Sequence, residues 1–289
     1  MKSMNHSAFR MMALVTALLV VVTFAARMNS GQPQRGMGHV TASDLTTAAE
    51  RNKLFSQDLN WTFGNKPQHG WYLYTPLIAQ LLNTKNDVGS EGFAKALARW
   101  QKQMGVTSSR VLDEQILYKM IAVWQGARLK DREPAQQNQL LTAPVSDFYD
   151  PSRAEELRQV ERTTYAAYKR LVAGAVSDRS LGLAHGKPGE LAPNEKFLKI
   201  ISAFRSREYQ DKLRRESPNA GSAGLAVNSP HFTGRALDLY VGGDPVDTRD
   251  SNRAVQVQTP VYKWLVRNAE RYGFRPYFYE PWHWEYVGK

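Results

Sequence analysis

The sequence of 289 residues contains no cysteine. This absence excludes disulfide scaffolds, thiolate zinc sites, iron–sulfur clusters and cysteine nucleophiles. Any metal ion must therefore be held by nitrogen and oxygen ligands. Histidine is also scarce, with six in the whole chain, so a histidine-based site has few positions from which to draw its ligands.

The chain also lacks any segment in which charge of one sign is concentrated. Its net charge of +11 divides into +4 over residues 1–39, +4 over residues 40–130 and +3 over residues 131–289. A weak, spread positive field suits attraction to an anionic polymer or surface, and we expect no nucleic-acid partner. Hydrophobic residues make up 42% and charged residues 22% of the chain. These shares are typical of globular proteins, and the length suggests two domains.

The N-terminus has the pattern of an export signal. Lys2 and Arg10 precede residues 11–26, an uncharged run rich in leucine and valine. Its length fits both the apolar region of a signal peptide and a short membrane span. Residues 1–27 are therefore predicted to be a signal peptide or a membrane anchor, and both interpretations stay open. In either case we expect an exported protein of the periplasm or cell envelope, with residues 11–26 as its anchor to the cytoplasmic membrane in the second case.

Segments rich in glycine and proline divide the rest of the chain. Residues 28–39 contain three glycines and a proline and are predicted to be a linker. A mostly helical domain is predicted over residues 40–130 and a connecting segment with prolines over residues 131–150. A second domain is predicted over residues 151–289.

The first domain is predicted to be helical from its apolar periodicity. Apolar side chains recur at steps of three and four, which predicts helices over residues 92–105 and 112–124. Residues 93–106 read Phe-Ala-Lys-Ala-Leu-Ala-Arg-Trp-Gln-Lys-Gln-Met-Gly-Val. This string resembles the second half of the small helical peptidoglycan-binding domain. The resemblance implies that residues 40–130 keep the protein close to the cell-wall polymer. The alternative is a helical accessory domain without a ligand.

The second domain alternates helical and extended patterns. Apolar spacing predicts a helix over residues 152–177. Thr259 and Pro260 mark the start of another helix, and Gly273 marks its end. Extended patterns predict strands over residues 197–202, 236–240 and 274–279.

Two histidines stand in sequence that suggests chemistry. His231 precedes a glycine turn and an apolar strand that carries Asp238, and His283 follows an aromatic-rich strand. A carboxylate in such a strand is costly unless a metal ion or an arginine compensates it. Two imidazoles and one carboxylate form a standard catalytic zinc set, with the fourth position left to water. Glu280 lies three residues before His283 and can act as the base toward that water.

Spacing alone leaves structural interpretations open for each of these residues. Either histidine can be a hydrogen-bonded core residue, Asp238 can be a buried salt-bridge partner, and Glu280 can be a surface acid. Three motifs in order favour the chemical interpretation. They are Ser-Ala-Phe-Arg-Ser-Arg-Glu-Tyr-Gln at 202–210, Ser-x-His-x-x-Gly-x-Ala-x-Asp at 229–238 and Glu-Pro-Trp-His at 280–283. Together they resemble the zinc D-alanyl-D-alanine carboxypeptidases of the VanY type. Ala203 and Phe204 depart from the Gly and Tyr that are commoner in that family.

The resemblance implies a fold, a reaction and a set of site residues. The fold is α+β, a small antiparallel sheet with packed helices, here preceded by the mostly helical domain. The reaction is zinc-dependent removal of the terminal D-alanine from peptidoglycan stem peptides. The implied roles are zinc ligation by His231, Asp238 and His283, base catalysis by Glu280, oxyanion stabilisation or substrate orientation by Arg205, and substrate contact by Ser229 and Gln210.

Two other functions remain compatible with these motifs. An endopeptidase would use the same zinc chemistry within the stem or at a crosslink. A non-catalytic cell-wall-binding module would retain the metal residues without turnover, but such a module would not need Glu280 as a base.

Overall fold

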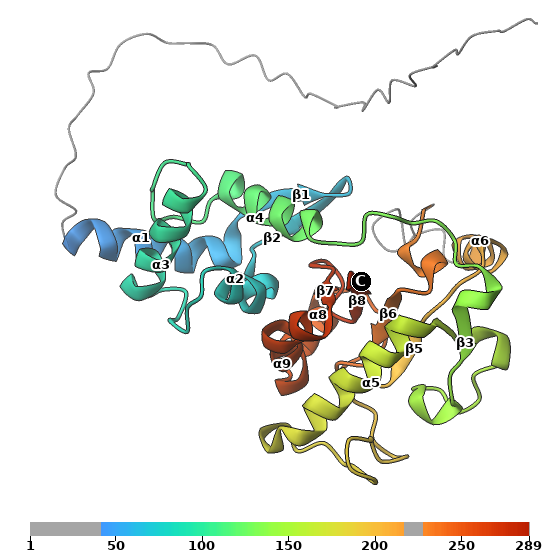
Figure 1. The fold of residues 1–289 in the computed structure, drawn as a ribbon. Coiled ribbons are helices and arrows are strands. Elements are labelled where there is room, and N and C mark those ends of the chain that lie inside the picture. The colour runs from blue at the N-terminus through green and yellow to red at the C-terminus, as the bar shows by residue number, and fades with distance from the viewer. Residues whose placement is uncertain (1–41, 217–227, 289) are drawn as a thin grey trace, which may run out of the picture. The chain divides into compact units, whose positions relative to one another are not determined.

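The computed structural model describes residues 42–216 and 228–288 (Figure 1). The predicted signal peptide or anchor at 1–27, its apolar run at 11–26 and the predicted linker at 28–39 lie outside these residues. Within the described ranges, no helix has both the length and the apolar character needed to cross a membrane.

The first part of the described chain is mostly helical. Helices α3 and α4 begin at polar caps, because the side chains of Ser90 and Asp113 accept hydrogen bonds from the main-chain amides of Phe93 and Ile116. These two helices confirm the predictions over residues 92–105 and 112–124. The elements of this part are α1 (Ala42–Asp58), β1 (Asn60–Phe63), β2 (Lys66–His69), α2 (Thr75–Leu81), α3 (Glu91–Gln103) and α4 (Glu114–Gly126).

The β1–β2 hairpin was not predicted from the sequence. It pairs Asn60 with His69 and Phe63 with Lys66. Its turn is made by Gly64 and Asn65, which both have positive φ. This conformation suits Gly and Asn, but the strands on either side carry too few apolar residues to show alternation.

The predicted helix over residues 152–177 is wrong in its first ten residues. Helix α5 (Arg162–Ser177) starts later, because the Glu161 carboxylate accepts hydrogen bonds from the amides of Thr163 and Thr164 and caps it. The preceding residues instead form a short 3-10 turn and strand β4 (Gln159–Glu161), which pairs with β3 (Leu140–Thr142).

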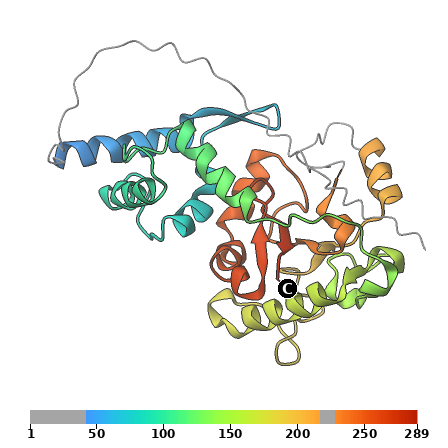
Figure 2. The same cartoon turned by 45° about the horizontal axis from the view of Figure 1, so that its top comes forward.

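A four-stranded antiparallel sheet lies at the centre of the second part. Its order is β5 (Ile200–Ser202), β6 (Ala236–Leu239), β8 (His283–Tyr286) and β7 (Phe274–Pro276). Helix α5 lies alongside this sheet in both views (Figures 1 and 2), and the Tyr168 hydroxyl donates to the Leu198 carbonyl at 3.2 Å. Among the described residues, the second part also contains helices α6 (Arg207–Glu216), α8 (Asp250–Gln258) and α9 (Pro260–Asn268).

The helix predicted from Thr259 to Gly273 is confirmed as α9 followed by a 3-10 turn, Ala269–Tyr272. Gly273 ends it with φ of 86°. The strand predicted over residues 274–279 is too long, because β7 ends at Pro276. After it the chain turns back, with the Tyr277 amide bonded to the His283 carbonyl and the Glu280 amide to the Tyr277 carbonyl. This reversal lets β8 pair with β7.

The apolar core extends through both parts. One cluster of buried side chains runs from Trp61 to Tyr286. The Phe278 ring lies 4.8 Å from Phe63 and 5.9 Å from Trp124, measured between ring centroids. The chain from Val40 onward forms one compact unit, and the domain boundaries given above stay a prediction. The predicted fold class, a small antiparallel sheet with packed helices preceded by a mostly helical region, is confirmed.

Candidate metal centre

The sheet register brings two of the predicted ligands face to face. Asp238 on β6 lies directly opposite His283 on β8, and paired residues of antiparallel strands point to the same face. His231 arrives from the 3-10 turn Pro230–Thr233, which Ser229 caps through its hydroxyl at 3.3 Å from the His231 amide. The turn ends at Gly234 in the left-handed conformation, with φ of 64°, and the chain then enters β6.

His231, Asp238 and His283 form one buried group of metal-ligand type. Each offers a ligand atom, and these atoms all lie within 4.8 Å of one another. His231 Nε2 is 3.3 Å from Asp238 Oδ2, and His283 Nδ1 is 2.9 Å from Asp238 Oδ1. Nitrogen and oxygen donors in a two-histidine, one-carboxylate set fit a divalent transition metal such as zinc.

The far nitrogen of each imidazole is held by an acceptor. His231 donates from Nδ1 to the main-chain carbonyl of Ala203 at 2.6 Å, and His283 Nε2 lies 3.2 Å from Glu285 Oε1. Such partners fix the ring orientation and leave the other nitrogen for the metal. The other nitrogen of each ring, His231 Nε2 and His283 Nδ1, therefore faces Asp238.

The charges around Asp238 keep it ionised although it is buried. Burial favours the neutral acid, but His231, Arg205 and hydrogen bonds from both histidines hold the Asp238 pKa well below its usual range. Burial and the Arg205 charge lower the pKa of His231 to about 4. His231 is thus neutral near pH 7, as a metal ligand must be.

His283 has the opposite tendency in the metal-free protein. Burial alone would lower its pKa, but hydrogen bonds and charges from Asp238 and Glu285 raise it to about 9. Burial likewise opposes ionisation of Glu285, yet His283 and Arg128 bring the Glu285 pKa down to about 2. A metal ion that binds here must displace the proton that His283 holds between two carboxylates.

Glu280 lies in the turn between β7 and β8 and is 7% exposed. Burial raises its pKa to about 8, and its charge interacts with His283, Asp238 and Arg205. Among the residues that the structure describes, none makes a hydrogen bond to its carboxylate. A carboxyl group with a pKa near neutrality, placed beside the ligand group, is suited to accept and return a proton.

Arg205, just after β5, is the cation of the site. Its Nη2 donates to Asp238 Oδ2 at 2.5 Å and its Nε to Ser202 Oγ at 2.8 Å. Gln210 on α6 approaches Nη1 at 3.4 Å through its side-chain oxygen. The structure therefore brings Arg205, Gln210 and Ser229 to the ligand group, while their roles toward substrate stay predictions.

Several residues of the site were not predicted. Ser202 orients Arg205, and the Ala203 carbonyl orients His231. A main-chain carbonyl gives no sequence signal. Glu285 could have been found from the sequence, because residues 283 and 285 of a strand point to the same face. Arg128 is 157 positions from Glu285, and nothing in the local sequence connects the two.

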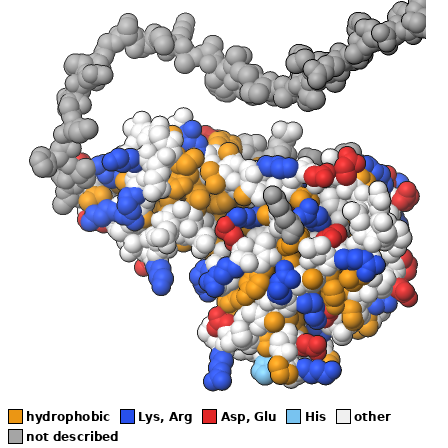
Figure 3. Space-filling view, viewed as in Figure 1, with side chains coloured by type: hydrophobic (Ala, Val, Ile, Leu, Met, Phe, Trp, Pro, Cys, Tyr) orange, Lys and Arg blue, Asp and Glu red, His pale blue; other side chains and the backbone are white. Residues whose placement is uncertain are grey.

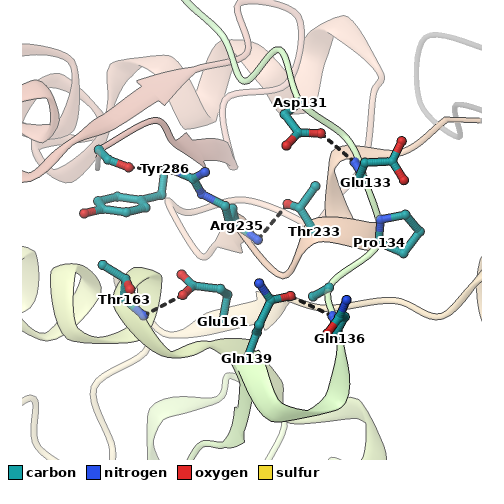
Figure 4. A pocket seen from close by; sticks show the side chains of 12 residues that line it. Asp131, Glu133, Pro134, Gln136, Gln139, Glu161, Thr163, Thr233, Arg235 and Tyr286 are labelled. Atoms are coloured by element: carbon teal, nitrogen blue, oxygen red, sulfur yellow. Dashed lines mark hydrogen bonds between the residues drawn. The ribbon is translucent and has the colours of Figure 1, made fainter. Parts of the chain in front are cut away.

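A cavity of about 370 Å³ is lined by other residues of the chain (Figure 4). None of the seven predicted site residues lines it. Three of its polar side chains already have partners: Asp131 accepts from the Glu133 amide, Glu161 caps α5, and Arg235 donates to the Gly288 carbonyl at 2.5 Å. The cavity therefore lies where several segments of the chain meet, and it is not formed by the predicted site residues.

Comparisons with known proteins agree with the predicted family. Residues 190–289 match the family model of VanY, described as a D-alanyl-D-alanine carboxypeptidase. This match includes the ligand group, Arg205 and Glu280. It confirms the resemblance read from the three motifs.

Among solved structures, the LdcB LD-carboxypeptidase, described as revealing the molecular basis of peptidoglycan recognition, is similar to this chain. The two are 23% identical with a TM-score of 0.39, over 55% of this chain and 72% of the other. No curated protein matches the chain.

Proposed function

We propose that this protein is an exported, zinc-dependent D,D-carboxypeptidase that releases the terminal D-alanine from peptidoglycan stem peptides. The observation that carries the proposal is the buried group of His231, Asp238 and His283, with ligand atoms within 4.8 Å of one another. Its place inside the VanY match at residues 190–289 supports the reaction class.

The three ligand residues would hold the metal ion through nitrogen and oxygen donors. A zinc ion bound there would act as a Lewis acid, polarising the scissile carbonyl and making water more acidic. Although burial favours the neutral acid, His231, Arg205 and the hydrogen bonds from both histidines keep Asp238 anionic. The Ala203 carbonyl and the Glu285 carboxylate hold the two imidazoles in their ligating orientation.

Glu280 and Arg205 would carry the proton and charge steps. Glu280 accepts a proton from the attacking water, whose oxygen bonds to the carbonyl carbon between the two D-alanines. It then returns that proton to the nitrogen of the departing D-alanine as the amide bond breaks. Arg205 stabilises the negative charge that develops on the carbonyl oxygen.

The spread positive charge of the chain suits an anionic wall polymer. Lysine and arginine side chains are distributed over the face seen in Figure 3 instead of gathering in one patch. We propose that residues 40–130 keep the catalytic residues near their polymeric substrate and so raise the effective concentration of stem peptides.

The activity is tested with a purified pentapeptide muropeptide and the full protein, with zinc or with chelator, followed by mass analysis of the products. Loss of one alanine mass, dependent on metal, is the expected result. Cleavage within the stem would instead indicate an endopeptidase. Unchanged substrate under zinc-replete conditions would contradict both and favour a wall-binding module.

Export is tested by fractionating cells that produce the full chain and by sequencing the N-terminus of the recovered protein. A new N-terminus near residue 27 indicates a cleaved signal, and an intact N-terminus in the membrane fraction indicates an anchor. Recovery of the intact chain from the cytoplasm would contradict the proposed export.

A further inference from the structure

Glu285 is a buried carboxylate beside a metal ligand. Its exposed fraction is 0%, and it follows His283 by two residues on β8, so both side chains point to the same face. Its Oε1 lies 3.2 Å from His283 Nε2, the nitrogen that faces away from Asp238. Glu285 therefore contacts the ligand on the side opposite to the metal position.

Glu285 is held by residues from the end of the helical region. Arg128 donates to Oε1 from Nε at 3.0 Å and also from Nη2, and the Leu129 amide donates to Oε2 at 2.9 Å. Arg128 is itself fixed to α4, because its Nη1 donates to Gln125 Oε1 at 2.7 Å. Each carboxylate oxygen of Glu285 therefore accepts a hydrogen bond from the segment just after α4, Oε1 from Arg128 and Oε2 from Leu129.

Arg128 is also connected to His283 through the ring of Tyr277. Its guanidinium lies over the Tyr277 ring, 4.0 Å from the centroid. The Tyr277 ring in turn meets the His283 ring at 82°, with centroids 5.9 Å apart. The imidazole is thus confined by a hydrogen bond at one nitrogen and by an aromatic ring that Arg128 covers.

We propose that Glu285, held by Arg128 and Leu129, is a positioning residue for the ligand His283. The end of the helical region thereby helps to orient a ligand of the metal centre. The inference rests on the proposed function, because it presupposes a metal ion on the His231, Asp238 and His283 group.

The physical reason is that a ligand imidazole needs an acceptor at its outer nitrogen. That acceptor fixes which nitrogen carries the proton and in which direction the other nitrogen points, and its loss typically weakens metal binding about 10- to 100-fold. Glu285 can serve as this acceptor inside the core only because Arg128 compensates its charge, since an unpaired buried carboxylate is strongly destabilising.

The test measures the zinc dissociation constant by competition with a chelator, using the full protein. E285A should weaken zinc binding about 10- to 100-fold. E285Q keeps an acceptor oxygen but loses the charge, so it should lose less. The single variant R128M should also weaken zinc binding. Because Arg128 acts through Glu285, the double variant R128M/E285A should bind zinc no more weakly than E285A.

A matched control is R253M. Arg253 is also a buried arginine between the two parts of the fold, donating to the Tyr74 hydroxyl and the Tyr279 carbonyl at 3.2 Å each. It touches none of the three ligands. R253M should lower the free energy of unfolding of the metal-free protein. Its zinc affinity should change less than about threefold, the size of effect expected from a substitution away from the site.

The visible spectrum of the cobalt-substituted protein gives a second readout. It should change in E285A and R128M, where the His283 ring is released, and stay as in the unmodified protein in R253M. Should R128M fail to fold with its uncompensated carboxylate, the double variant removes that charge and still reports on zinc affinity.

The outcomes separate this inference from the proposed function. If the unmodified protein binds zinc and cleaves the pentapeptide while E285A and R128M bind zinc equally well, the positioning role is wrong and the proposed function stands. If the unmodified protein binds no zinc, the proposed function fails first. Equal losses of zinc affinity in R128M and R253M would indicate only a general effect of loosened packing and would overturn the inference.

Discussion

His231 and His283 share one carboxylate but differ in their electrostatic surroundings. His231 lies near the Arg205 charge, and its pKa is lowered to about 4. His283 lies between Asp238 and Glu285, and its pKa is raised to about 9. One ligand is therefore ready for a metal near pH 7, and the other must first release a proton. This difference at the scale of single residues would make metal binding at this group depend on pH.

Zinc affinity should rise with pH. Because His283 holds its proton up to a pKa of about 9, zinc must displace that proton at lower pH. We expect the affinity to increase by up to about tenfold per pH unit between about pH 6.5 and 8.5. Chelator competition at several pH values, corrected for chelator protonation, measures it. H185N, at an exposed histidine, is the control, and an affinity independent of pH would contradict the assignment.

The metal-free protein should show the opposite trend in stability. A histidine whose pKa is raised from 6.5 to about 9 stabilises the fold fully below pH 6.5. That contribution is lost as the pH rises through about 9. In chelator, denaturant unfolding should therefore need less denaturant near pH 9 than near pH 6.5. H283N should flatten this dependence, and an unchanged slope in H283N would show that other groups cause it.

Glu280 is expected to separate turnover from metal binding. The variant E280Q keeps the shape of the side chain but cannot accept a proton, so the rate of D-alanine release should fall about 10²- to 10⁴-fold. Zinc affinity should stay close to that of the unmodified protein, because Glu280 is not among the ligands. Steady-state rates and chelator competition on the same samples check both expectations. Full activity in E280Q would exclude its role as the base.

At the scale of elements, the site depends on how the turn at Pro230–Thr233 leads into β6. Gly234 ends this turn with φ of 64°. A Cβ at that position would meet the Glu161 amide nitrogen at 2.9 Å and the Leu140 side chain at 2.9 Å. The strand pair β3–β4 thus closes over the turn and fixes the direction in which His231 enters the site.

G234A should therefore lower both stability and metal affinity. The left-handed backbone and the close contacts should cost about 1–3 kcal/mol in the free energy of unfolding. Because the turn carries His231, zinc binding should also weaken. G186A is the matched control, since a Cβ there meets nothing within 4 Å. Denaturant unfolding and chelator competition measure both effects, and equal behaviour of the two variants would contradict this account.

At the scale of the whole molecule, one large apolar core extends through both parts of the described chain. The Phe278 ring is 2% exposed and contacts Phe63 and Tyr74, at 4.8 and 5.3 Å between ring centroids. Phe278 lies two residues before Glu280, so the packing of the helical region also supports the turn that carries the predicted base.

F278A should lower the free energy of unfolding by about 3–5 kcal/mol. We expect a single cooperative transition in which helix content and tryptophan fluorescence change together, because both parts lose packing at once. V255A, at a side chain that is 55% exposed, should change stability by about 0.5 kcal/mol or less. Two separate transitions in the unmodified protein would show that the two parts unfold independently.

The sequence by itself determined the types of the candidate ligands, helices α3, α4, α9 and most of α5, the approximate positions of strands β5, β6 and β7, and the fold class. The other described helices and strands were not predicted individually. Each of the three motifs lies within a short stretch, and their joint resemblance to a known family favoured a metal site at His231, Asp238 and His283, which spacing alone had left open. Caps such as Thr259 and the terminal Gly273 also act within a few residues. These features can be predicted from the sequence because they depend on interactions between residues close together in the chain.

The tertiary structure alone decided the contacts that join distant segments. Arg128 meets Glu285 across 157 positions, and the residues just before α5 are extended where β4 pairs with β3. Strand alternation could have placed Glu285 beside His283, but not its partner. A buried charge is stable only where another segment supplies the opposite charge, and which segment arrives there depends on how the whole chain packs.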